Sequence, residues 1–203
     1  MGNRYVQNAC RPKGFGGRRF IRHMDRHHEE LATWGLSHIE PAPDARVLDA
    51  GCGGGAHAAR LLDLCPAGHV CGLDYSATSV RVSRRRNAAA IRAGRCEIVQ
   101  ADVRTIPWAA ETFDLVTAFE TVYYWPGPDV SFREVCRVLK PGGRFLLCNE
   151  DTDPATDPWV GVIRGLTIYP AETLEALLRE AGFRTVDCYT EKTHGWLTVV
   201  AEK

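Results

Sequence analysis

The chain has no long hydrophobic run and no excess of charge of either sign. No apolar stretch approaches the ~20 residues that span a membrane, and residues 1–14 lack the apolar segment of a signal peptide. The 25 basic residues are balanced by 25 acidic ones, so the overall charge gives no reason to expect a nucleic-acid partner. We therefore expect a cytoplasmic protein that binds neither membranes nor nucleic acid.

Closely spaced cysteines are also missing. The eight cysteines are scattered, and no two of them form a C-x-x-C pair. We therefore expect no disulfide framework, no zinc site and no other bound metal. Most of the cysteines fall in predicted strands or helices, where a free thiol packs as a small hydrophobe. A reducing compartment fits this pattern best.

The length of 203 residues fits one compact domain. Residues 1–16 are rich in Gly and Arg and are predicted to form an arm. From Gly17 to Trp34 apolar residues recur at helical spacing, which predicts one helix. A rigid Pro-containing connector follows. The prediction is thus an N-terminal arm and helix at 1–43, followed by the main part of the domain at 44–203.

From residue 44 onward the pattern alternates between strands and helices. Such alternation requires a mostly parallel sheet with helices on both faces, and ligands then bind beyond the carboxyl ends of the strands. Ser76 is the expected N-cap of the second helix of this series. The predicted elements are strands at 45–50, 69–74, 96–102, 113–119 and 144–149, helices at 56–65, 76–93, 129–139 and 170–181, and a closing hairpin at 183–203.

The segment VLDAGCGGG at 47–55 joins the first of these strands to the first helix. Gly51, Gly53 and Gly55 permit a tight turn and let a ligand approach bare backbone N–H groups. The same spacing satisfies the dinucleotide pattern G-x-G-x-x-G/A. Asp49 separates the two interpretations, because a carboxylate at this strand end repels a pyrophosphate. It suits a ligand that carries an ammonium group and no phosphate, such as S-adenosylmethionine.

Two further acids end the next two strands of the chain. Asp74 lies 19 residues after Gly55, where a carboxylate can accept hydrogen bonds from both ribose hydroxyls of an adenosyl ligand. Tyr75 is expected to lie against the adenine, and Asp102 to accept from the adenine amino group. A single Asp at a strand end is more often a turn residue or a helix cap. Three of them beside a glycine loop favour a cofactor site.

Five segments together resemble the class I S-adenosylmethionine-dependent methyltransferases: VLDAGCGGG, GLDYS, QADVRTIPW, FDLVTAFE and FREVCRVLKPGGRFLL. They look most like the branch that contains ubiquinone- and menaquinone-pathway methylases. The resemblance covers about residues 45–150 and the closing hairpin. It implies an α/β, Rossmann-like fold with a seven-stranded, mostly parallel sheet and a C-terminal antiparallel hairpin. The cofactor-binding residues it implies are Asp49, Gly51, Cys52, Gly53, Gly55, Asp74, Tyr75, Asp102, Val103 and Glu120.

The N-terminal part carries a second resemblance. The predicted 17–34 helix is similar to the lid that closes over the cofactor in small-molecule methyltransferases and excludes water. The surrounding pattern resembles a bacterial subgroup of the family: Arg-Pro-x-Gly at 11–14, Gly17-Arg18, His28, Leu31 and Trp34-Gly35-Leu36. A histidine beside an apolar helix face is more often a packing residue than a base. His28 is the first choice for a base on this helix because it matches the subgroup pattern.

The methyl acceptor must be recognised by residues around the methyl group, since the fold itself is generic. The segment after the fourth strand, 120–125, lacks the Asn/Asp-Pro-Pro-aromatic motif of enzymes that methylate base amines or glutamine amides. Its aromatic residues either wall an acceptor pocket or simply pack the loop. We predict SN2 methyl transfer to an N, O, S or C nucleophile of a small molecule. If the nucleophile must lose a proton, the candidate bases are His28, Glu120 and Tyr123.

Three other functions stay open at this stage. A protein- or RNA-directed methyltransferase should show a recognition appendage or a basic rim. A non-catalytic protein would bind S-adenosylmethionine and transfer nothing. Metalloid methylation needs several thiolates at the methyl group, for which Cys10 and Cys148 are the candidates. We expect a monomer or a homodimer.

Overall fold

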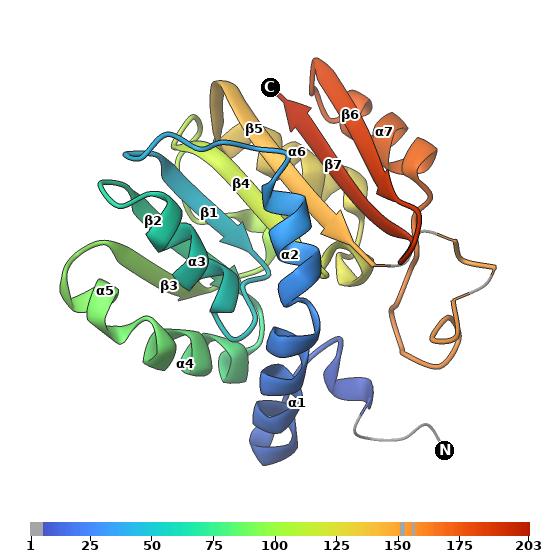
Figure 1. The fold of residues 1–203 in the computed structure, drawn as a ribbon, viewed down its shortest axis with the longest axis horizontal. Helices are drawn as coiled ribbons and strands as arrows, with labels where there is room; N and C mark the ends of the chain where they lie inside the picture. The colour runs from blue at the N-terminus through green and yellow to red at the C-terminus, as the bar shows by residue number, and fades with distance from the viewer. Residues whose placement is uncertain (1–5, 151–152, 156) are drawn as a thin grey trace.

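The computed structural model describes residues 6–150, 153–155 and 157–203, so residues 1–5 of the predicted arm lie outside the described part. A seven-stranded sheet forms the centre of the molecule, in the order β3-β2-β1-β4-β5-β7-β6 (Figure 1). The first five strands of the chain pair in parallel, whereas β7 is antiparallel to both β5 and β6. The predicted α/β class and the C-terminal antiparallel hairpin are thereby confirmed. The strands are β1 Arg46–Ala50, β2 His69–Asp74, β3 Cys96–Gln100, β4 Phe113–Phe119, β5 Leu139–Asn149, β6 Thr185–Glu191 and β7 Trp196–Glu202.

Helices cover both faces of the sheet. Because side chains alternate along a strand, Val47 and Leu146 point to the face that packs on α2, α3 and α4. Leu48 and Phe145 point to the opposite face, which packs on α6 and α7. Burying each such side chain contributes roughly 1.5–3 kcal/mol. The helices are α1 Gly14–His27, α2 Glu29–Leu36, α3 Ala56–Leu64, α4 Ala77–Arg86, α5 Ala88–Arg92, α6 Pro128–Val138 and α7 Ala171–Glu180, with 3-10 turns at Val6–Asn8, Val103–Thr105 and Val122–Tyr124.

The single helix predicted at 17–34 is wrong in two respects. The helix begins earlier, at Gly14, and it breaks at His28, which has φ −93° and ψ 11°. The two halves bury their apolar faces against different partners. Phe20 of α1 faces a cavity at the end of the sheet, whereas Leu31 of α2 lies in the core beside the sheet. One straight helix cannot place both apolar faces in these surroundings, so the chain bends between α1 and α2.

The helix predicted at 76–93 also divides into two, α4 and α5. Its predicted N-cap is confirmed, because the Ser76 hydroxyl accepts a hydrogen bond from the Ser79 N–H. The break falls at Asn87, whose buried side-chain amide donates to the carbonyl oxygens of Gly55 and Ser83, each 3.1 Å away. This amide ties the helix pair to the glycine loop, and a pattern of apolar spacing does not reveal such a contact.

Strand β5 is longer than predicted, because it starts at Leu139 instead of Arg144. Leu139 pairs with Phe113 before the register shifts by a bulge, and the regular pairing resumes at Arg144. The Pro-Gly-Gly turn after Lys140 therefore lies inside the strand. All eight cysteines are free thiols and six of them are buried, as expected. Among the described residues, no helix is both long and apolar enough to cross a membrane.

Candidate active site

A cavity of about 450 Å³ lies beyond the carboxyl ends of β1, β2 and β4. This volume falls in the ~300–1,000 Å³ range of small-molecule sites. Figure 1 shows α1 below the ends of these strands, and Phe20, Ile21 and Met24 of this helix form an apolar part of the cavity wall. The helical spacing of these residues is visible in the sequence, but the surface that they face is not. The helix α1 thus forms part of the cavity wall, and its role as a lid stays a prediction.

The glycine loop forms one side of the cavity through Gly51, Cys52 and Gly53. Gly51 has φ +82°, and a Cβ at this position would lie 2.1 Å from the Thr121 hydroxyl oxygen. A side chain is therefore excluded both by the backbone conformation and by space. The result is a wall of bare backbone, as the sequence pattern requires. Gly55 is not part of the wall, since it caps α3 and packs against α4.

Asp49 lies beneath this loop and is not part of the cavity wall. Its carboxylate accepts a hydrogen bond from the Thr117 hydroxyl at 3.2 Å, while its Oδ2 atom is buried without a hydrogen-bond partner. Burial raises the pKa of Asp49 to about 7. A buried carboxylate oxygen without a partner is costly, and a nearby cationic group would offset that cost. The residue thus has the property expected of a counter-charge to an ammonium group.

Asp74 is part of the cavity wall, at the end of β2. Its Oδ2 accepts a hydrogen bond from the Gly53 N–H at 3.0 Å, and its Oδ1 accepts from the Ser76 N–H at 2.7 Å. Burial raises its pKa to about 6, against the effect of these two hydrogen bonds. A carboxylate oxygen accepts more than one hydrogen bond. Asp74 can therefore also receive ligand hydroxyls from the cavity.

The two other residues predicted to hold an adenine also line the cavity, but both have protein partners. The Tyr75 hydroxyl donates to the Cys10 carbonyl oxygen, and the Arg11 guanidinium lies 5.2 Å from the centre of its ring. Tyr75 thereby holds the N-terminal segment against the cavity. Asp102 binds the Arg104 side chain through both oxygens, at 3.0 and 2.7 Å, and this hydrogen bonding lowers its pKa. A bond from Asp102 to an adenine amino group would compete with Arg104. Val103, another of the predicted cofactor residues, is buried in the same wall, and Glu120, the last of them, also lines the cavity.

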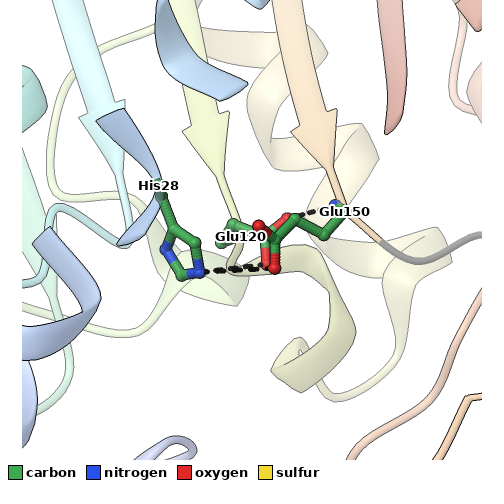
Figure 2. Close-up of side chains that lie close together, drawn as sticks. All are labelled: His28, Glu120 and Glu150. Atoms are coloured by element: carbon green, nitrogen blue, oxygen red, sulfur yellow. Dashed lines mark hydrogen bonds and ion pairs between the residues drawn. The ribbon is translucent and has the colours of Figure 1, made fainter. Parts of the chain in front are cut away.

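A second set of polar side chains meets where α1, β4 and β5 end (Figure 2). His28 follows α1, Glu120 follows β4 and Glu150 follows β5. The His28 Nε2 atom lies 3.6 Å from a Glu120 carboxylate oxygen and 3.7 Å from a Glu150 carboxylate oxygen. We call these three residues the His–Glu–Glu cluster. Two of them, His28 and Glu120, are part of the cavity wall.

The backbone around the cluster is unusual at two of its three positions. Glu120 has φ +54°, a left-handed conformation that residues other than Gly rarely adopt, and His28 occupies the bend between two helices. Strained conformations of this kind gather at functional sites. Two hydrogen bonds orient the Glu120 carboxylate, because the Tyr123 hydroxyl (3.2 Å) and the Glu150 backbone N–H both donate to its Oε1 atom. Tyr123 itself is buried and is not part of the cavity wall.

The electrostatics of the cluster follow from its burial. Burial, with smaller contributions from the nearby His27, His57 and His23, lowers the pKa of His28 to about 3, so the imidazole is neutral at pH 7. Burial also raises the pKa of Glu150, while His27 and His194 oppose that rise. The His28 Nε2 atom has no hydrogen-bond partner. Glu150 is therefore better suited than His28 to take up a proton.

The sequence predicted three residues in this part of the site. His28, Glu120 and Tyr123 were the candidate bases, and the structure brings them together around one carboxylate. Tyr124 and Trp125 line the cavity. His57 also lines the cavity, with its ring 4.4 Å from that of Phe119, and no sequence signal marked it.

Comparison with known proteins agrees with this geometry. Residues 48–147 match the family described as "Methyltransferase domain". An O-methyltransferase of Pyrenophora dematioidea is 27% identical over 172 residues, which make up 82% of this chain and 64% of that protein. A demethylmenaquinone methyltransferase of Clavibacter sepedonicus is 33% identical over 141 residues, or 70% of this chain and 54% of that protein. The chain spans less than two thirds of the length of these curated relatives.

A solved structure extends the likeness to nearly the whole fold. The methyltransferase of Haloferax volcanii, solved in complex with the Trm112 methyltransferase activator, superposes with a TM-score of 0.82 at 21% identity. The match covers 90% of this chain and 92% of that one. The fold and the glycine-walled cavity define a Rossmann-like methyltransferase domain. The chain belongs to the class I S-adenosylmethionine-dependent methyltransferases, whose cofactor is S-adenosylmethionine.

Proposed function

We propose that the protein transfers the methyl group of S-adenosylmethionine to a small molecule that enters the cavity beside the His–Glu–Glu cluster. The observation that carries this proposal is that one cavity wall contains both the glycine loop with Asp74 and the cluster residues His28 and Glu120. A site for the methyl donor and a polar site for an acceptor would thus share one cavity.

The residues present fit the cofactor. Asp74 would hold the ribose, the Gly51–Gly53 backbone would lie against the ligand, and the Asp49 carboxylate, buried beneath that loop, would act as a counter-charge to its ammonium group. Bound there, S-adenosylmethionine supplies an electrophilic methyl group on a sulfonium sulfur. The protein's contribution is to hold the nucleophile and the donor in line and to exclude water.

The cluster residues would hold the acceptor and take up its proton. His28 and Glu120 bind the nucleophilic group, and Tyr123 keeps the Glu120 carboxylate in place. A proton lost by the nucleophile would pass to Glu150, whose Oε1 atom lies 3.7 Å from Nε2 of the exposed His27. His27 connects this carboxylate to solvent.

The size of the cavity supports a small acceptor. With α1 in its present position, the same 450 Å³ must hold both the donor and the acceptor. The names of the two relatives, an O-methyltransferase and a demethylmenaquinone methyltransferase, agree with this class. The solved neighbour in complex with Trm112 is the observation that keeps a partner-dependent methyltransferase as the second candidate.

Two alternative functions are metalloid methylation and cofactor binding without methyl transfer. Metalloid methylation is disfavoured, because one of its two candidate cysteines, Cys10, is part of the cavity wall, but the other, Cys148, is buried against Thr198 outside it. Cys52 lies in the wall, but burial raises its pKa well above the usual value and keeps it a thiol. A non-catalytic cofactor-binding protein is distinguished only by a transfer assay.

The deciding experiment uses S-adenosylmethionine with a radiolabelled methyl group. The purified protein and a cell extract are incubated with it, and the label is then measured in the small-molecule and the macromolecular fractions. Asp74→Ala serves as the control that should transfer no label. Label in the small-molecule fraction supports the proposal, label in protein or RNA replaces it with the second candidate, and no label favours cofactor binding alone.

A further inference from the structure

The His–Glu–Glu cluster has one feature that the bonding within the protein does not explain. The His28 Nε2 atom is buried, points at two carboxylates, and lies just too far from both for a hydrogen bond (Figure 2). Only 6% of the residue is exposed to solvent. Buried polar atoms almost always have a partner, and an exception calls for a bound water or ion.

The distances in the cluster suit one metal ion. One ligand atom from each residue can be chosen so that all three lie within 4.8 Å of one another. An ion with metal–ligand bonds of about 2.1 Å joins two atoms up to about 4.2 Å apart. Both distances from His28 Nε2 to the carboxylates are below that limit.

The charges also fit a cation. Glu120 and Glu150 lie side by side, and two carboxylates repel each other in a partly buried site. An imidazole nitrogen is a common metal ligand, and the His28 Nε2 atom lies close to both carboxylates. One imidazole and two carboxylates make a mixed N/O set, which suits Mn²⁺ or Fe²⁺ better than the all-oxygen sites of Mg²⁺ and Ca²⁺.

We infer that His28, Glu120 and Glu150 bind one divalent transition-metal ion of the Mn²⁺ or Fe²⁺ type at the acceptor end of the cavity. Because His28 and Glu120 are part of the cavity wall, the open positions of the ion face the acceptor. The ion would bind an oxygen of the acceptor and lower the pKa of a hydroxyl there. This role of the ion rests on the proposed function, and it implies that the acceptor is a small molecule with a hydroxyl or carboxylate group. The binding of the ion itself does not depend on the proposed function.

The test is a titration of the EDTA-treated, dialysed full chain with Mn²⁺, followed by calorimetry and by the EPR signal of free Mn²⁺. Mn²⁺ is the probe because it binds thiols and surface histidines weakly. The wild type should bind one ion per chain. Glu150→Gln and His28→Ala should each weaken the binding at least tenfold. Glu172→Gln, which removes the same charge from an exposed position on α7, should leave it unchanged.

S-adenosylmethionine binding, measured on the same samples, separates loss of fold from loss of the site. Glu150→Gln should keep the wild-type affinity for the cofactor, since Glu150 is not part of the cavity wall. The inference is overturned if the wild type binds no Mn²⁺, or if Glu150→Gln and Glu172→Gln bind it equally well. If the ion binds but no acceptor is methylated, the proposed function fails and the metal site stands.

Discussion

The backbone N–H of Gly53 donates a hydrogen bond to the Asp74 carboxylate, 3.0 Å away. This contact joins the loop that follows β1 to the end of β2, two segments whose strands are neighbours in the sheet. The other carboxylate oxygen caps the Ser76 N–H at the start of α4. Asp74 therefore fixes the shape of the glycine loop and also faces the cavity.

Replacing Asp74 with Ala is expected to weaken S-adenosylmethionine binding more than tenfold. A hydrogen bond to a charged group contributes ~1.5–3 kcal/mol, and the loop loses its anchor at the same time. Calorimetric titration measures the affinity. Asp63→Ala, an exposed position on α3, is the matched control. Equal affinity of the Asp74 variant and the wild type would show that Asp74 does not hold the ribose.

Gly51→Ala is expected to destabilise the protein and to weaken cofactor binding. The new Cβ would lie 2.1 Å from the Thr121 hydroxyl oxygen in a backbone with φ +82°. Gly142→Ala is the control, because Gly142 has φ +75° but nothing within 4 Å of its Cβ position. The two variants share the backbone strain, so any larger loss of Tm in Gly51→Ala measures the crowding. Equal losses in the two variants would show that Thr121 moves aside freely.

The repeating pattern of strands and helices made the layered fold predictable from the sequence. Buried strands such as 113–119 are mostly apolar and are followed by loop residues, so β4 was predicted with its bounds as observed. The strand-end acids Asp74 and Asp102 were found for the same reason, because parallel strands all end at one edge of the sheet. These features depend on local pattern and on the rules of parallel sheets.

The features that were not predicted depend on contacts between distant segments. The break at His28 arises because α1 and α2 bury their apolar faces against different surroundings. The break at Asn87 arises because its side-chain amide binds the Gly55 carbonyl, 32 residues away in the chain. The His–Glu–Glu cluster is similar. Its members are separated by 92 and 30 positions in the sequence, and no local pattern indicates that Glu150 lies against His28.

The stability of the protein should depend on pH through Asp49. Its pKa is about 7 in the folded protein and near 3.8 when unfolded, so between these values the folded state holds a proton that the unfolded state has released. Stability is therefore lost as the pH rises from 4 to 7, by up to about 4 kcal/mol at about 1.36 kcal/mol per pKa unit. In Asp49→Asn this loss disappears.

Thermal unfolding of Asp49→Asn and of the wild type, at pH 4 and at pH 8, measures this effect. About 1 kcal/mol moves the Tm of a domain of this size by about 2–4 °C. From pH 4 to pH 8 the Tm of the wild type should therefore fall by several degrees more than the Tm of the variant. A Tm difference that stays constant from pH 4 to pH 8 would show that Asp49 is ionised at both.

Gly35→Ala should destabilise the protein, although Ala normally favours a helix by about 1 kcal/mol over Gly. A Cβ at Gly35 of α2 would lie 2.1 Å from the Cys148 sulfur, in the buried contact between α2 and β5. Overpacking of this kind costs about 1–3 kcal/mol. Cys148→Ala removes the sulfur, so the double variant should unfold at higher urea concentration than Gly35→Ala alone, as a double-mutant cycle measures. If the second substitution fails to restore stability, the crowding has another source. If it succeeds, Cys148 acts in packing, which agrees with its position outside the cavity wall.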